Sequence, residues 1–269
     1  MITKKIFLLK FIIMKIQKIV LIFFSCLLIG LIVYQIRFGE TIKNEKILVV
    51  GTSLDYPPYE FIDSNTQKPA GLDIDLVTEI AQRIDKDLVI EDKPFSSLIF
   101  GLLTNDVDMV ASGISPTPRR AKLVSFSELY LTAMPFVVVT KSAQLQPINI
   151  DDLKDKIVGV NTGYVTDLYM TKEYPDITLV KLDSPADCFM ALQIGTIDAF
   201  VTSPHTFKIF LENISNPQDF FMMQLPGTGE ICAFAVAKNN EKLLVQINQV
   251  LEAMRVDGTL EKIKQKWGF

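Results

Sequence analysis

The sequence is poor in the residues on which most metal centres and nucleophilic catalytic sites depend. Its 269 residues include one histidine, three cysteines and one tryptophan. A single histidine, His205, excludes for practical purposes His-rich metal sites and His-based catalytic triads. The composition therefore predicts neither a metal nor another cofactor.

Cysteine adds little information about function. Cys188 and Cys232 are the only cysteines after residue 36, and each lies inside an apolar pattern. A disulfide and two buried free thiols both remain open, and the apolar surroundings favour free thiols.

Positive charge is scarce outside the first residues. The chain has 27 Lys and Arg against 31 Asp and Glu. Five of the lysines lie within the first 36 residues, which contain no acid, so the remainder carries a formal charge of −9. This charge argues against nucleic acid and against an anionic membrane surface as partners.

The first 36 residues form a segment of a different kind. Lysines up to Lys18 are followed by an apolar run over 19–36. A positive segment followed by an apolar run is typical of an export signal, with the lysines on the cytoplasmic side. We therefore expect 1–36 to be a signal peptide or a membrane anchor and 37–44 to be a linker.

The fate of this segment stays open on sequence grounds. It has no small-residue cleavage site, and the run is near the lower limit for a bilayer span, so retention is favoured over cleavage. Lipidation at Cys26 is a weaker alternative, and Met14 could be the true start of the signal. We expect the rest of the chain in the periplasm or at the outer face of the cytoplasmic membrane, with this segment as a candidate tether.

Beyond the linker, short β-rich runs alternate with helical patterns. Residues 46–53 are typical of a buried strand, and 73–84 of an amphipathic helix capped by Asp73. The alternation continues over 88–112 and 156–214, and two helical patterns close the chain. Such alternation predicts an α/β fold with largely parallel sheets.

An internal similarity predicts two related lobes. Residues 102–112 and 192–202 align with Asp108 over Asp198, and both segments have the pattern helix, tight turn, buried strand. Apolar runs at 136–142 and 230–238 could each carry the chain across a hinge. We therefore expect lobe one to span 45–138 plus 231–269, and lobe two to span 141–226.

The loop SGISPTPRR, residues 112–120, follows a predicted strand. In open parallel sheets, ligands bind beyond the carboxyl ends of the strands. Gly113 would allow a ligand to approach the backbone, and an arginine would pair bidentately with a carboxylate. Alternatively, Arg119 and Arg120 are solvated charges at the start of a helix.

Several segments together resemble the family 3 bacterial extracellular solute-binding proteins, which serve polar amino-acid ABC transporters. They are VGTSLDYPPYEFID, AGLDIDLVTEIAQRI, FSSLIFGLLTNDVDMVASGISPTPRR, SFSELY, KIVGVNTGYV, GTIDAFVTSP and MRVDGTLEKIKQKWGF. The resemblance covers residues 46–269. It implies a type II periplasmic binding protein fold with two α/β lobes joined by two extended crossings. It also implies capture of a small amino acid or related carboxylate for an ABC permease, and we expect a monomer.

The resemblance also implies a set of ligand-binding residues. The carboxylate-binding arginine falls on Arg120, and the aromatic walls fall on Tyr56 and Phe95, with Tyr59 as a further candidate. Other positions implied to fix the ligand are Ser112, Gly113, Ser115, Thr162, Val165 and Thr166. Alternatively, the two tyrosines lie in a proline-rich surface turn and Phe95 is core packing.

Two positions depart from the family pattern. Ser203 and Ser53 stand where the family commonly has aspartates, the first of which pairs with the ligand's ammonium group. Residues two apart in a strand lie on the same face, so Asp55 points as Ser53 does and could supply the missing charge. Otherwise the ligand is a carboxylate without an ammonium group.

Two other function classes remain open. A dehydratase-like enzyme on the same fold would need a catalytic acid in the cleft, for which Glu230 or Asp55 could serve. No second catalytic group accompanies either residue, so we expect no enzyme and no catalytic residue. The possible anchor would also suit a ligand-sensing domain.

Overall fold

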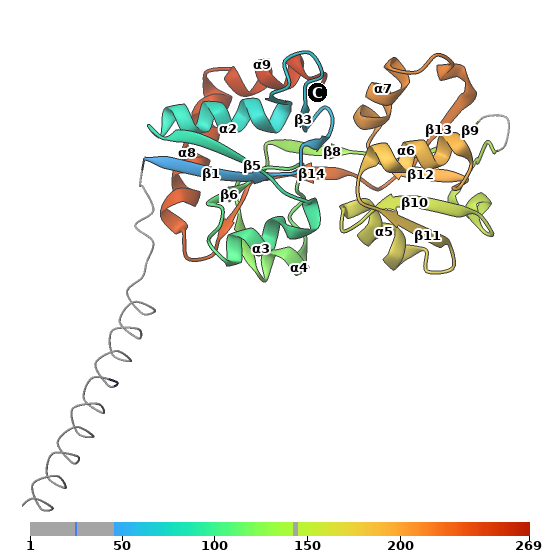
Figure 1. Ribbon diagram of the computed structural model, residues 1–269, viewed down its shortest axis with the longest axis horizontal. Coiled ribbons are helices and arrows are strands. Elements are labelled where there is room, and N and C mark those ends of the chain that lie inside the picture. Colours follow the sequence, from blue (N-terminus) through green and yellow to red (C-terminus); the bar gives the residue numbers. More distant parts are fainter. Residues whose placement is uncertain (1–24, 26–45, 142–144) are drawn as a thin grey trace, which may run out of the picture. The chain divides into compact units, whose positions relative to one another are not determined.

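The computed structural model describes Ser25, residues 46–141 and residues 145–269 (Figure 1). The expected signal or anchor at 1–36, the lipidation site at Cys26 and the linker at 37–44 are therefore outside the described residues, apart from Ser25. Among the described residues, no helix is long and apolar enough to cross a membrane.

The first sheet has the strand order β5-β1-β6-β15-β7. Strands β5 (Asp87–Asp92) and β6 (Met109–Val110) run parallel to β1 (Ile47–Thr52) on either side of it. Strand β15 (Ala235–Ala237) is antiparallel to β6 and to β7 (Val124–Phe126). The sheet is thus mostly parallel with one antiparallel insertion from the end of the chain, and with its helices it forms lobe one.

Helices cover both faces of this sheet because its strands are apolar on both sides. Helices α2 (Leu72–Arg83), α8 (Glu241–Val256) and α9 (Thr259–Lys266) lie on one face, and α3 (Leu98–Leu103) lies on the other (Figure 1). Leu48 and Val50 pack into the core under α2 and α8, whereas Val49 packs against the core under α3.

The second sheet has the order β11-β10-β12-β9-β13 and forms lobe two with α5, α6 and α7. Its strands are β9 (Val137–Lys141), β10 (Ile157–Asn161), β11 (Thr178–Leu182), β12 (Ala199–Thr202) and β13 (Phe220–Gln224), and its helices are α5 (Val165–Glu173), α6 (Pro185–Ile194) and α7 (Pro204–Glu212). Strand β9 shows the two-sided burial: Val138 packs toward α5, and Val137 and Val139 pack toward α6 and α7.

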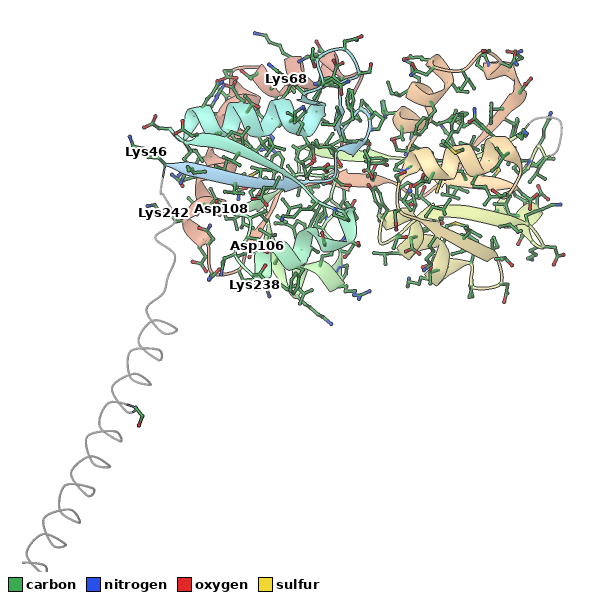
Figure 2. The ribbon with its side chains drawn as sticks, viewed as in Figure 1. Lys46, Lys68, Asp106, Asp108, Lys238 and Lys242 are labelled. Carbon is green, nitrogen blue, oxygen red and sulfur yellow. The ribbon has the colours of Figure 1, made fainter. Side chains whose placement is uncertain are left out.

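The internal similarity corresponds to an equivalent turn in each lobe. The Asp108 carboxylate accepts the Val49 N–H at 3.0 Å, and the Asp198 carboxylate accepts the Ile157 N–H at 2.8 Å. Figure 2 shows Asp108 on the same side of the first sheet as Lys46 and Lys242, away from lobe two. The carboxyl ends of β1 and β6 therefore face the other way, toward lobe two.

One of the two crossings between the lobes lies within an expected run, at 230–238, and the other does not. Strand β8 (Leu131–Met134) pairs antiparallel with β14 (Glu230–Cys232) in a separate two-stranded sheet. The run at 136–142 is instead largely β9, a strand of the second sheet between β12 and β13. Residues 137 and 138 thus belong to lobe two. A crossing and a doubly buried strand share the same apolar pattern, which is why the sequence does not separate them.

A second correction concerns the start of α2. Gly71, with φ of 129°, occupies the cap position, and Asp73 lies inside the helix and is buried. Its carboxylate accepts the Gly113 N–H at 2.8 Å and the Tyr130 hydroxyl at 2.7 Å. Asp73 therefore connects α2 to the loop at 112–120 and to Tyr130, and it does not cap its own helix.

The remaining elements are short. They are β2 (Asp55–Tyr56), β3 (Glu60–Ile62) and β4 (Pro69–Ala70), which form a three-stranded sheet, the helix α4 (Pro118–Ala121), and the 3-10 turns Phe95–Ser97, Ile150–Leu153 and Pro217–Asp219. Both Cys188 and Cys232 are free and buried, as their apolar surroundings favoured.

Candidate functional site

The loop after β6 places its two arginines in opposite environments. Thr117 caps the short helix α4, because its side chain accepts the Arg120 backbone N–H at 3.2 Å, and Pro118 starts the helix. Arg119 is exposed, whereas Arg120 is only 7% exposed. The structure thus buries the arginine that we expected to face the ligand and exposes its neighbour.

The Arg120 guanidinium joins the two lobes. One of its nitrogens donates to the Ser115 carbonyl at 2.8 Å, and the other donates to the Gly163 carbonyl of lobe two, also at 2.8 Å. Its central carbon lies 5.3 Å from the centre of the Phe95 ring. Burial lowers the pKa of Arg120 to about 10, and the charge of Glu230 opposes that shift. A guanidinium has five N–H donors, so donors remain for a ligand.

Two tyrosines form a stacked pair beside this loop. The rings of Tyr56 and Tyr59 lie 4.8 Å apart with an angle of 7° between their planes, and both side chains are buried. A Cβ at Gly113, whose φ is 50°, would touch both rings at 3.4 to 3.5 Å. The alternative of a proline-rich surface turn is therefore wrong for both tyrosines.

Tyr164 of lobe two completes the aromatic group, and the sequence reasoning did not identify it. Its ring centre lies 4.1 Å from that of Phe95, with a tilt of 31°, and 5.1 Å from that of Tyr56, edge-on. Tyr164 is 3% exposed, and its hydroxyl has no hydrogen-bond partner in the described part of the chain. Its only signal in the sequence is its place within the loop 162–166.

Phe95 packs in the core and also lies in the candidate site. It packs against both apolar cores of lobe one, and it is half-buried rather than buried. It also contacts Tyr164 and lies near the Arg120 guanidinium. Core packing and a place in the candidate site are therefore compatible for this residue.

The polar groups of Ser112 and Gly113 already have hydrogen-bond partners elsewhere in lobe one. Ser112 accepts the Ser53 N–H at 3.1 Å and donates to Glu60 at 2.8 Å. The Gly113 N–H is bonded to Asp73. The buried Ser115 hydroxyl, in contrast, has no partner among the described residues. Ser112 and Gly113 therefore position the loop, and Ser115 is the residue with a free hydroxyl.

The loop at 162–166 also uses most of its donors within lobe two. The N–H and the hydroxyl of Thr162 both bond the Leu182 carbonyl, and the Gly163 N–H bonds the Asp167 carboxylate at 2.9 Å. Val165 is half-buried, Thr166 is buried, and both lie in the first turn of α5, where backbone N–H groups have no acceptor within the helix.

Three carboxylic acids are buried on the lobe-one side of the site. Glu60 is bonded to Ser112, and one of its oxygens has no partner in the described residues. Burial raises the pKa of Glu60 well above its usual range, and that of Asp73 to about 7. Glu230, on the crossing strand β14, accepts long hydrogen bonds of 3.3 and 3.4 Å from the Tyr56 hydroxyl, and burial raises its pKa to about 7.

The two serines that depart from the family pattern are part of local hydrogen-bond networks. Ser203 is buried and caps α7, because its hydroxyl accepts the Thr206 N–H at 3.1 Å. The Ser53 hydroxyl donates to Asp55 at 2.9 Å. Burial is the main cause that raises the pKa of Asp55 to about 6.

Two pockets lie on either side of Phe95 and Ser96, which line both. One, of about 360 Å³, is lined by three aspartates, Asp55, Asp92 and Asp183, and by Lys93. The other, of about 320 Å³, is lined by the two arginines of the loop, by Gly163 and by apolar side chains. The site thus has an acidic side and a guanidinium side.

The chain is similar in sequence to a known protein family and to its members. Residues 48–269 match the family model described as bacterial extracellular solute-binding proteins, family 3. The arginine-binding extracellular protein ArtP of Bacillus subtilis is 30% identical over 227 residues, which are 84% of this chain and 87% of ArtP.

Solved structures of amino acid-binding proteins are similar to this chain over most of its length. An ancestral arginine-binding protein bound to arginine superimposes with a TM-score of 0.78 at 32% identity, over 83% of this chain and 99% of that one. An ancestral amino acid-binding protein described as a precursor of cyclohexadienyl dehydratase has a TM-score of 0.75 at 28% identity, over 84% of this chain and 97% of that one.

Proposed function

The chain belongs to the bacterial extracellular solute-binding proteins of family 3 and is a solute-binding protein, and we propose that its ligand is an amino acid with a cationic side group. The observation that carries this proposal is the polarity of the site, with a buried guanidinium on one side of Phe95 and three aspartates on the other.

The guanidinium side would bind the ligand's carboxylate. Arg120 is buried, has no ion pair within the described residues, and keeps donors beyond the two that it uses. The Ser115 hydroxyl and the first-turn N–H groups of Val165 and Thr166 would add hydrogen bonds. A carboxylate that took the outer donors of Arg120 would replace the Gly163 carbonyl.

The acidic side would bind a cationic side group. Asp55, Asp92 and Asp183 outnumber the single lysine of that pocket. Phe95, at its border, would offer a π face to a guanidinium. The similarity to two proteins that are described as arginine-binding supports the same class of ligand.

The further expectations about the protein's role are proposals of the same kind. The antiparallel pair β8 and β14 would act as the hinge on which the lobes close over the ligand. The loaded protein would then dock on the permease of an ABC transporter. We place it in the periplasm or at the outer face of the cytoplasmic membrane, tethered by residues 1–36, as a monomer.

Binding without catalysis is favoured over the dehydratase alternative. Glu230 is bonded to Tyr56, and Asp55 is bonded to Ser53. In the described part of the chain, the side-chain hydrogen bonds of both carboxyl groups come from hydroxyls and not from a histidine or lysine that could complete a catalytic pair. The similar structure that is described as a dehydratase precursor is itself described as an amino acid-binding protein, so this similarity does not favour an enzyme.

Calorimetric titration with L-arginine and with agmatine tests the proposal, because agmatine keeps the guanidinium but lacks the carboxylate. Loss of a charge-assisted contact to a buried arginine costs about 2 to 5 kcal/mol, so agmatine should bind at least about 30-fold more weakly. Equal affinities would contradict the role of the guanidinium side. Failure of arginine, histidine and glutamine all to bind would contradict an amino-acid ligand.

A further inference from the structure

The proposed site lacks an acid at Ser203, where a charge for the ligand's ammonium group was expected, and also at Ser53, the other departure from the family pattern. Ser203 is fully buried and caps α7. Ser53 donates its hydroxyl to Asp55. A serine hydroxyl cannot replace a full negative charge, so an amino-acid ligand needs another carboxylate near Ser203.

Glu230 is a carboxylate that is buried without a cation. It is 2% exposed, and its hydrogen bonds are the two long ones from the Tyr56 hydroxyl, at 3.3 and 3.4 Å. No ion pair of Glu230 occurs among the residues that the structure describes. A buried carboxylate in this situation is costly unless it is neutral or meets a cation.

The groups around Glu230 are suited to an ammonium ion. The Tyr59 hydroxyl is fully buried, carries no hydrogen bond within the described part of the chain, and is close enough to Glu230 for that charge to raise its pKa. Burial and the charge of Glu230 raise the pKa of Tyr56 well above its usual range, and the hydroxyls of Ser203 and Thr206 oppose this shift. The Tyr56 hydroxyl therefore donates to Glu230 and is influenced by the hydroxyls at the cap of α7.

The charges of Arg120 and Glu230 act on each other without forming an ion pair. Glu230 is the charge that most opposes the lowering of the Arg120 pKa by burial, and the two charged groups lie more than 4.0 Å apart. A carboxylate on Arg120 and an ammonium group toward Glu230 would neutralise both buried charges.

We propose that Glu230 recognises the ammonium group of the ligand, and that it supplies from the crossing strand the charge that position 203 lacks. This inference rests on the proposed function. The three N–H donors of an ammonium group would go to the Glu230 carboxylate and to the oxygen of Tyr59. Asp55, which the sequence suggested for this task, lines the acidic pocket and instead serves the side group.

The test is the affinity ratio of two probes that differ only in the ammonium group, L-arginine and 5-guanidinopentanoic acid. The wild type should prefer arginine by at least about 30-fold, the factor typical of a buried charge contact. Glu230→Gln should bring the ratio close to one, mainly by weakening arginine. Asp55→Asn should weaken both probes and leave the ratio unchanged. The exposed Glu212→Gln is the matched control and should change neither affinity.

A second measurement needs no variant of Glu230. Because a cation lowers the pKa of a neighbouring acid, arginine binding near pH 6 should release a proton that the analogue does not release. Calorimetry in two buffers with different ionisation enthalpies measures this release. Absence of the release, or a wild-type ratio in Glu230→Gln, would overturn the inference. Equal binding of both probes by the wild type would also overturn it but leave the proposed function standing. Binding of neither probe would contradict both.

Discussion

Replacement of Glu230 by glutamine should change how the stability of the protein depends on pH. Burial raises the pKa of Glu230 from 4.5 to about 7, so the folded protein keeps this carboxyl protonated at pH values where the unfolded chain has lost the proton. The folded state binds more protons in that window, so the free energy of unfolding falls as pH rises from about 4.5 to about 7. Glutamine has the same shape and cannot ionise.

The size of the effect follows from the shift. One pKa unit corresponds to about 1.4 kcal/mol, and integration from pH 5 to pH 8 gives a loss of about 2 to 3 kcal/mol from this residue. The pKa values of Asp73 and Glu60 are raised in the same direction in both proteins. The charge of Glu230 also contributes to the raised pKa of Glu60, so the difference between wild type and Glu230→Gln measures Glu230 together with its coupling to the neighbouring acids.

Urea unfolding of ligand-stripped protein at pH 5 and pH 8 measures this difference. Glu230→Gln should gain about 2 to 3 kcal/mol relative to the wild type between the two pH values, and Glu212→Gln should follow the wild type. Parallel pH profiles for the wild type and Glu230→Gln would refute the reasoning, because they would mean that this carboxyl is ionised in the folded protein without cost.

Two further predictions concern the fold. Gly71→Ala should cost more than about 3 kcal/mol in urea unfolding, because φ is 129° and a Cβ would collide with the Tyr59 carbonyl. Gly195→Ala, with φ of 78° and open space, should cost only about 1 to 2 kcal/mol, and equal losses would contradict the steric argument. Asp108→Ala and Asp198→Ala should each cost about 1 kcal/mol, since each leaves one strand N–H without its acceptor. A loss at only one of them would show that the two turns are not equivalent.

The sequence predicts the elements and the two-lobe division well because these depend on local patterns. Strands such as β1 and helices such as α2 are close to their expected limits. The alignment of Asp108 with Asp198 in the sequence predicts the turn that both lobes share. The identity of the crossings depends instead on which apolar run pairs with which, and that is a long-range property.

The residues of the candidate site also differ in how far the sequence predicts them. Arg120 is predictable because the proline-rich loop that carries it follows a strand end. Tyr164 is not predictable, and the sequence suggests Glu230 only as the acid of the enzyme alternative, because each of these residues meets Tyr56 across a sequence separation of more than 100 residues. The pattern also does not reveal that the N–H of Gly113 is already used within the fold.

The most direct test of the central claim, that a buried arginine between the lobes binds the carboxylate of an amino acid, is calorimetric titration of two neighbouring variants with L-arginine. Arg120→Ala should lose at least about 30-fold in affinity, because a buried charge-assisted contact is worth about 2 to 5 kcal/mol. Lys122→Ala should bind like the wild type, because that side chain is exposed and lines neither pocket. Equal losses in both variants, or wild-type affinity in Arg120→Ala, would contradict the account.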